Sequence, residues 1–453
     1  MSIVATLKYA FRGLLRSRTL ADTAWLGSST VFNGVLGAVV AGIYARFLGV
    51  SDFGTFTLII SLLTLMTSLS DLGLSSTVVR FGAERLALGD RDGLRTVLSL
   101  SLQFKLFLTL CVLVVATVFL DPLIRLLFGH VSAEIPRYFA LSLVAFTLSA
   151  GAAFFTPVYQ VFGQFRRQAI LSLIPAITKL ALVWGILMMS GAVTVTQAIW
   201  FEAAGSLGLL ALAAAFSPEK RFAWRHLDRG TRRSIISFNK WLSLYTLISL
   251  VGGRSDIYFV GGLLDARALG VYGGANKIAS VLTVVANSYL SVLLRDFSGA
   301  VTRVALHRKQ MQSWMVVGLM VAGIGLAALL APTIVWVIYG PRFGDTVVLF
   351  RIMCAGVALY VIGFPAFASF YALNKSSAYP LVSLVGLAGL LVGNARLVPI
   401  FGVYGAAYAF VLSNIASLVA VLVYYGVMRR RLARERFGPE DPAGGEPPGE
   451  TPV

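Results

Sequence analysis

Charged side chains stand inside several long apolar stretches of this sequence, and they are the residues best placed to do chemistry. The cations are Arg46, Lys105, Lys179, Arg254, Lys277 and Arg351, and the acids are Asp71, Glu202 and Asp256. A charge at the centre of a bilayer costs roughly 2.5–3.5 kcal/mol on insertion scales, so such residues usually face a polar cavity. The excess of cations predicts a cavity for an anion, because arginine binds phosphate through its planar fork and lysine as a point charge.

These cations do not all call for the same interpretation. Lys105, Arg46 and Arg351 could line the cavity, or they could extend to the membrane interface. Lys179, Arg254 and Lys277 are better explained by the cavity. Arg254 and Asp256 could neutralise each other, but residues two apart on a helix point to different sides. A direct pair therefore requires the helix to break at GlyGlyArgSer, 252–255.

The three acids suggest a second role. Intramembrane carboxylates recur where proton transfer is coupled to transport, so Asp71, Asp256 and Glu202 are candidate coupling residues. Asp71 could equally be the structural partner of a nearby cation or backbone group.

Motifs for other chemistry are missing from the sequence. It has no G-x-x-x-x-G-K-[ST] phosphate loop and no H-E-x-x-H metal pair. Its three histidines lie in separate loops, and no long external loop carries the paired carboxylates of acid–base catalysis. We therefore expect no catalytic residues, no metal, no cofactor and no enzyme activity.

Composition indicates the elements that hold these residues. The 453 residues are 57% hydrophobic and 13% charged, whereas soluble domains are about 45–50% apolar and about 25% charged. We predict an all-α polytopic membrane protein with twelve spans of about 20 residues. The predicted spans are 24–45, 55–79, 97–120, 138–162, 169–190, 197–215, 241–263, 271–294, 313–338, 346–372, 378–395 and 403–427.

Basic residues between the spans set the orientation. With both termini in the cytoplasm, 27 of the 38 Lys and Arg residues fall on the inner side and six on the outer side. This asymmetry follows the positive-inside rule. The high net charge of +18 is thus explained by loops beside a membrane, and we expect no nucleic-acid partner.

The same pattern divides the chain into five parts. Residues 1–22 carry basic residues at helical spacing, which suggests an interfacial amphipathic helix or else a basic tail. An N-lobe of six spans follows at 23–215, then a basic cytoplasmic linker at 216–240 and a C-lobe of six spans at 241–428. The tail, 429–453, is first basic and then rich in Pro, Gly and acids, which is typical of disorder.

An internal repeat supports the two lobes. LGVSDFGTF at 48–56 aligns with LDARALGVY at 264–272, which matches Gly54 to Gly270 at an offset of 216. VFGQFRRQAILSL at 161–173 aligns with ALNKSSAYPLVSL at 372–384 at an offset of 211. Because six spans are an even number, the two lobes share one orientation. A parallel repeat of this kind has its pseudo-two-fold axis along the membrane normal and its site between the repeats.

Three stretches resemble a known family. ARFLGVSDFGTFTLIISLLTLMTSLSDLGLSSTVVRFGAER (45–85), SDIYFVGGLLDARALGVYGGANKIAS (255–280) and IFGVYGAAYAF (400–410) resemble the Wzx-type polysaccharide flippases of the multidrug/oligosaccharidyl-lipid/polysaccharide exporter superfamily. The resemblance implies a V of two six-helix lobes around a cationic cavity. It also implies that the cargo is an undecaprenyl-diphosphate-linked oligosaccharide, moved from the cytoplasmic to the periplasmic leaflet of a bacterial inner membrane by alternating access.

Other functions remain open on the sequence. A cation-coupled drug exporter or a lipid II flippase could share the fold, although lipid II flippases typically have two more helices. A glycan polymerase and a non-transporting scaffold are further alternatives. The resemblance implies lipid-linked oligosaccharide and membrane lipids as partners, together with a polysaccharide polymerase and assembly proteins.

Overall fold

Helices account for every regular element of the described chain. The computed structural model describes residues 18–119, 128, 134–219, 239, 243, 246–247, 250, 252–298, 303–372 and 378–437. Within these ranges eleven helical stretches are long and apolar enough to cross a membrane, and each overlaps one of the twelve predicted spans. Of the remaining span, 241–263, the structure describes residues 243, 246–247, 250 and 252–263. The chain is a multi-pass, all-helical membrane protein.

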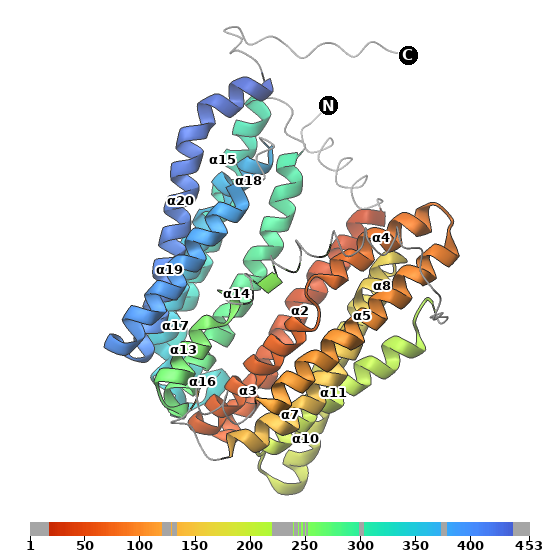
Figure 1. The fold of residues 1–453 in the computed structure, drawn as a ribbon. Coiled ribbons are helices and arrows are strands. Elements are labelled where there is room, and N and C mark those ends of the chain that lie inside the picture. Colours follow the sequence, from red (N-terminus) through yellow and green to blue (C-terminus); the bar gives the residue numbers. More distant parts are fainter. Residues whose placement is uncertain are drawn as a thin grey trace, which may run out of the picture.

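Two groups of helices form the two lobes in Figure 1. They approach each other at one end of the molecule and diverge toward the end where α2 begins and α20 ends. The first lobe contains α2 (Arg18–Leu48), α3 (Val50–Leu69), α4 (Leu74–Ala87), α5 (Arg91–Val118), α7 (Ile135–Ala153), α8 (Phe155–Val161), α9 (Phe165–Ser172), α10 (Ile174–Ser190) and α11 (Val195–Ala215). The second lobe contains α13 (Ser255–Leu263), α14 (Ala266–Ser298), α15 (Arg303–Leu329), α16 (Ala331–Tyr339), α17 (Thr346–Ile362), α18 (Phe364–Ala372), α19 (Ala378–Phe401) and α20 (Val403–Phe437).

Several spans consist of two helices with a break between them. Pro175 and Pro332 stand at the start of α10 and α16, where the missing N–H costs no helical hydrogen bond. The break between α3 and α4 has no proline. There the chain turns through Leu72, with φ of 41°, and Gly73, with φ of 79°. Hydropathy predicted the spans, but these breaks divide them into shorter helices that can lie at different angles.

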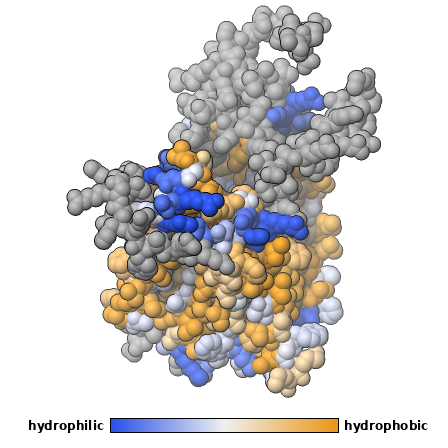
Figure 2. All heavy atoms as spheres, turned by 90° about the vertical axis from the view of Figure 1, so that its right-hand side faces the viewer, coloured by the Kyte–Doolittle hydropathy of each residue, from blue (hydrophilic) through white to orange (hydrophobic). Residues whose placement is uncertain are grey.

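The outer surface of the first lobe is apolar around its middle. Figure 2 shows a broad hydrophobic band with hydrophilic residues gathered above and below it. Large apolar side chains are exposed on both lobes, among them Met189 at 87% and Leu319 at 75%. A soluble surface would rarely leave so many such side chains uncovered. The band is the surface expected to face lipid.

The two lobes meet most closely where α3 crosses α14. A Cβ placed on Gly54 would collide with the carbonyl oxygen of Ala266, and one placed on Gly270 would collide with that of Val50. The offset of 216 relates Val50 to Ala266 and Gly54 to Gly270, so each contact is the equivalent of the other. Two segments related by a two-fold axis can form both of these equivalent contacts with each other only where they lie beside the axis. The parallel repeat predicted from the sequence thus has its axis at this crossing.

Three predicted segments lie mainly outside the described residues. They are the amphipathic stretch at 1–22, the basic linker at 216–240 and the part of the tail after residue 437. Their boundaries remain predictions.

Candidate functional site

Three of the six predicted cations come together from the two lobes. The ammonium group of Lys277 on α14 lies beside α2, where a Cβ on Gly37 would be 3.3 Å from Nζ. Lys179 on α10, Glu202 on α11 and Arg254 beside α13 are near enough to act electrostatically on Lys277. All four charged side chains are partly exposed. We call Lys179, Glu202, Arg254 and Lys277 the interlobe cluster.

The charges of the interlobe cluster do not cancel. Lys179 Nζ lies 3.0 Å from both carboxylate oxygens of Glu202, so these two form an ion pair. The side chains of Lys277 and Arg254 have no hydrogen-bond or ion-pair partner among the described residues. Three cations and one acid give a net charge of 3 − 1 = +2, which becomes +1 when Asp256, near enough to act electrostatically on Arg254, is counted as well. This excess sits between lobes, where an anion could balance it.

A helix break positions Arg254. The chain turns at Arg254, with φ of −144° and ψ of 12°, and α13 begins at the next residue. Asp256, two residues on, is buried and accepts hydrogen bonds from Tyr272 at 2.6 Å and Asn276 at 2.9 Å. In the described chain no ion pair links it to Arg254. The helix does break, as direct pairing required. The carboxylate of Asp256, however, is hydrogen-bonded to side chains of α14, so the guanidinium group of Arg254 could bind another anion.

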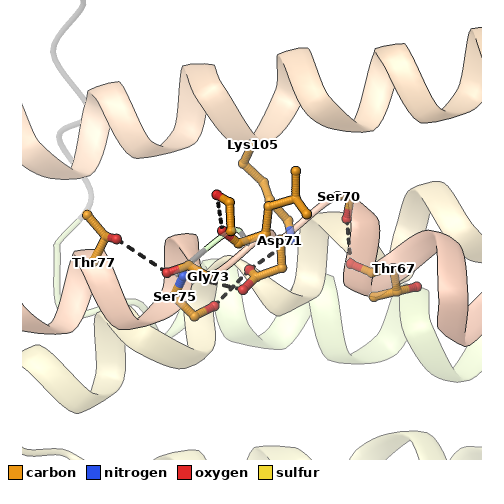
Figure 3. A network of polar contacts seen from close by, with 9 residues as sticks. Thr67, Ser70, Asp71, Gly73, Ser75, Thr77 and Lys105 are labelled. Atoms are coloured by element: carbon orange, nitrogen blue, oxygen red, sulfur yellow. Dashed lines mark hydrogen bonds and ion pairs between the residues drawn. The ribbon is translucent and has the colours of Figure 1, made fainter. Parts of the chain in front are cut away.

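Lys105 lies elsewhere, in a network within the first lobe (Figure 3). Its ammonium group is 3.2 Å from Asp71 Oδ1, and its side chain is only 2% exposed. Asp71 follows the end of α3 and also accepts a hydrogen bond of 2.8 Å from the hydroxyl of Ser75 on α4. This geometry corresponds to the structural alternative for Asp71, in which it partners a nearby cation.

Arg46 and Arg351 bind backbone carbonyl groups. Arg46, in the last turn of α2, donates to the carbonyl of Ile338 at 3.0 Å and also to that of Val337, both on α16 of the other lobe. It lies nine residues beyond Gly37, or roughly 13 Å along the helix at about 1.5 Å per residue. Arg351 on α17 donates to the carbonyl of Ala328 at 3.1 Å. Of the six predicted cations, these two and Lys105 are engaged outside the interlobe cluster.

Tyr44 is a candidate site residue that the sequence analysis missed. Its hydroxyl is buried and has no hydrogen-bond partner in the part of the chain that the structure describes, and Glu202 is near enough to act on it electrostatically. Seven residues separate it from Gly37, which places both on the face of α2 that meets the interlobe cluster. Its ring packs edge-on against Phe56, with 5.0 Å between centroids. That spacing from Gly37 is the only signal in the sequence, and many core tyrosines would show the same.

Comparison with known proteins places this arrangement in a family. The model of a family described as polysaccharide biosynthesis proteins matches residues 19–294. The chain belongs to the polysaccharide biosynthesis protein family. No curated protein sequence matches it.

Solved structures show which fold this polysaccharide biosynthesis protein has. It is similar to the lipid II flippase MurJ in an inward closed conformation, with a TM-score of 0.72 and 14% identity over 90% of this chain and 89% of that one. It is also similar to an inward-facing multidrug resistance MATE family transporter of the MOP superfamily, with a TM-score of 0.69 and 15% identity over 88% and 94% of the two chains. The fold is thus the two-lobe MOP fold.

A third similar structure is that of a MOP superfamily transporter from Pyrococcus furiosus, described as having a binding pocket of reverse polarity. The TM-score is 0.61, with 16% identity over 93% of this chain and 97% of that one. The family and the fold confirm the resemblance and the fold class predicted from the sequence. The three similar structures named here are those of transporters and a flippase.

Proposed function

We propose that the protein is a flippase that moves undecaprenyl-diphosphate-linked oligosaccharide from the cytoplasmic to the periplasmic leaflet of a bacterial inner membrane. The observation that carries this proposal is the excess positive charge of the interlobe cluster. A diphosphate diester carries one negative charge on each phosphate, which matches the unpartnered Lys277 and Arg254. Moving such a headgroup out of water is costly unless charges and hydrogen-bond donors replace the water.

The Lys179–Glu202 pair gives the site a way to adapt to its cargo. A phosphate that approaches Lys277 also approaches Lys179, whose ammonium group can turn from Glu202 toward the new anion. The unpartnered hydroxyl of Tyr44 offers a further donor beside Glu202. A site of this composition favours anions. A cationic drug would be repelled by the net charge, so the exporter alternative fits less well.

Alternating access follows from the arrangement of the lobes. They meet at the α3–α14 crossing and diverge toward the end where α20 finishes. The positive-inside rule assigns that end to the cytoplasm, with both termini there. The described conformation would then receive cargo from the cytoplasmic leaflet, and rocking about the crossing would present it to the periplasm. A polysaccharide polymerase would be the partner that uses the flipped repeat unit.

The proposal is tested by translocation of a fluorescent undecaprenyl-diphosphate oligosaccharide in proteoliposomes. A charge-assisted hydrogen bond contributes about 1.5–3 kcal/mol, so Lys277→Ala and Arg254→Ala should each slow the initial rate by about 10- to 100-fold. Lys179→Ala should slow it as well. Arg351→Ala is the matched control, because this arginine is also intramembrane but bonds to a carbonyl group of its own lobe.

Two outcomes would count against the proposal. Equal rates in wild type, Lys277→Ala and Arg254→Ala would remove the interlobe cluster from the mechanism. A folded wild type that moves no lipid-linked oligosaccharide but exports a cationic dye would favour the small-molecule exporter. Movement of lipid II alone would favour the peptidoglycan precursor as cargo.

A further inference from the structure

The second lobe contains an apolar pocket of about 540 Å³ that the charged site does not use. Its walls come from α14, α17, α18, α19 and α20, with Gly252 just before α13. Leu290, Phe364, Leu390 and Leu418 are among the side chains that line it. Ligand-binding cavities commonly measure about 300–1,000 Å³, so this one is large enough for a specific ligand.

Three of the five polar side chains that line the pocket form hydrogen bonds within the second lobe. The hydroxyl of Ser413 donates to the carbonyl of Gly386 at 2.7 Å, and the amide of Asn414 donates to the carbonyl of Phe410 at 2.8 Å. The hydroxyl of Tyr360 donates to Asn287 at 2.8 Å. The hydroxyl groups of Ser413 and Tyr360 are therefore unavailable as donors to a sugar or a phosphate, and Ser383 and Ser417 are the other hydroxyl groups of a mainly apolar wall. The pocket selects for a hydrocarbon chain, whose burial is favourable in proportion to the apolar area covered.

One wall residue of the pocket, Gly252, lies close along the chain to the interlobe cluster. It is packed so closely on α19 that a Cβ there would be 2.7 Å from Leu387 Cδ1. Arg254 of the cluster is only two residues farther along the chain. A cationic site next to an apolar pocket suits an amphiphile with an anionic head and a hydrocarbon tail.

We propose that this pocket binds the isoprenoid units next to the diphosphate of a polyprenyl diphosphate. The inference rests on the proposed function, because it takes the interlobe cluster as the headgroup site. It adds that the part of the tail nearest the headgroup enters the second lobe, while the rest stays in the bilayer. Recognition of the cargo then depends on the polyprenyl chain as well as on the charge.

The test uses photolabelling of the full chain in nanodiscs. The probe is farnesyl diphosphate with a diazirine at the end of its isoprenoid chain, and the comparison probe is the same photoreactive chain as an alcohol. We expect labelling of segments 380–390 and 413–421 by the diphosphate probe to exceed that by the alcohol by about tenfold, because charge-assisted bonds anchor only the former.

Two substitutions in the pocket wall and one control, all on α19, complete the experiment. Leu390→Trp fills the pocket and should lower this labelling by about tenfold, as should Ser383→Trp, which enters from a more exposed position of the wall. Val392→Trp, on a side chain that is 62% exposed and does not line the pocket, should leave it unchanged.

Each contrary result has a definite meaning. Equal labelling by both probes would show that the pocket holds any bilayer hydrocarbon chain, and would overturn the proposal. Labelling that neither tryptophan in the pocket reduces would overturn it too. In either case, loss of flipping in Lys277→Ala would leave the proposed function standing. A wild type that neither flips the fluorescent cargo nor takes up label would contradict both.

Discussion

At the scale of single residues, the intramembrane charges differ in what surrounds them rather than in type. Lys105 and Lys179 are both lysines within spans, yet Lys105 is enclosed with Asp71 in one lobe whereas Lys179 belongs to a cluster shared by two. Hydropathy shows that such a residue lies in the membrane. It cannot show which acid is near, because Glu202 and Lys179 are brought together by the packing of α10 on α11.

The ion pair of Lys105 with Asp71 leads to a prediction about stability. Lys105→Met would leave Asp71 as an uncompensated charge in the first lobe, and because Asp71 is 27% exposed the cost should fall below the roughly 3–5 kcal/mol of a fully buried pair. Lys105→Met with Asp71→Asn removes both charges and should recover most of the loss. Thermal unfolding of the purified protein in detergent measures both effects.

The same pair of variants separates a structural role from ion coupling. A double variant that is stable and still flips its cargo with the same dependence on the proton gradient would assign Asp71 to structure. Loss of that dependence in a stable double variant would instead assign Asp71 to coupling.

At the scale of helices, the spans were predictable and their breaks were not. A long run of apolar residues is sufficient to indicate a span, and Pro332 or Pro175 could have marked a break beside it. The break after α3 depends on Leu72 in a conformation that a non-glycine residue rarely adopts. Gly73 is a weak local signal in a chain with 44 glycines, and the break is also held by distant contacts such as that of Ser243 with the Leu72 carbonyl at 2.9 Å.

Arg46 connects two helices of different lobes, and its removal should favour their separation. In alternating access the closed end must open, so the bonds from Arg46 to the carbonyl groups of α16 must break. Arg46→Ala should shift the population by about 2- to 10-fold toward the state in which the α2–α16 contact is broken, since each such bond contributes about 0.5–1.5 kcal/mol net. Disulfide crosslinking between Gly42→Cys and Ile338→Cys, where a Cβ on Gly42 would be 2.7 Å from Ile338 Cγ2, reports the closed state once Cys111 and Cys354 are replaced.

Arg351→Ala is the control for this experiment, because its bond to Ala328 lies within the second lobe. It should leave the crosslinking yield unchanged. If Arg46→Ala crosslinks as fully as the parent protein, the Arg46 bonds do not hold the lobes together.

At the scale of the whole molecule, the repeat explains more of the structure than any single motif. Two segment pairs with similar offsets were enough to predict two parallel lobes. The contact between Gly54 and Gly270 could not be predicted from them, because only the three-dimensional arrangement determines which residues lie at the axis. The offset also pairs Thr57 with Gly273, and a Cβ on Gly273 would be 2.8 Å from Thr57 Cγ2. The axis is thus surrounded by residues that face their own equivalents.

This reciprocal packing predicts that Gly54→Ala and Gly270→Ala have closely matched effects. In each case the new Cβ meets a backbone carbonyl that cannot move without separating α3 from α14. Overpacking typically costs about 1–3 kcal/mol, so both variants should unfold at lower temperature and flip cargo more slowly. Gly318→Ala, which has open space around it, should be neutral in both assays. If one axis glycine tolerates alanine at the wild-type rate while the other does not, the lobes do not pivot symmetrically about this crossing.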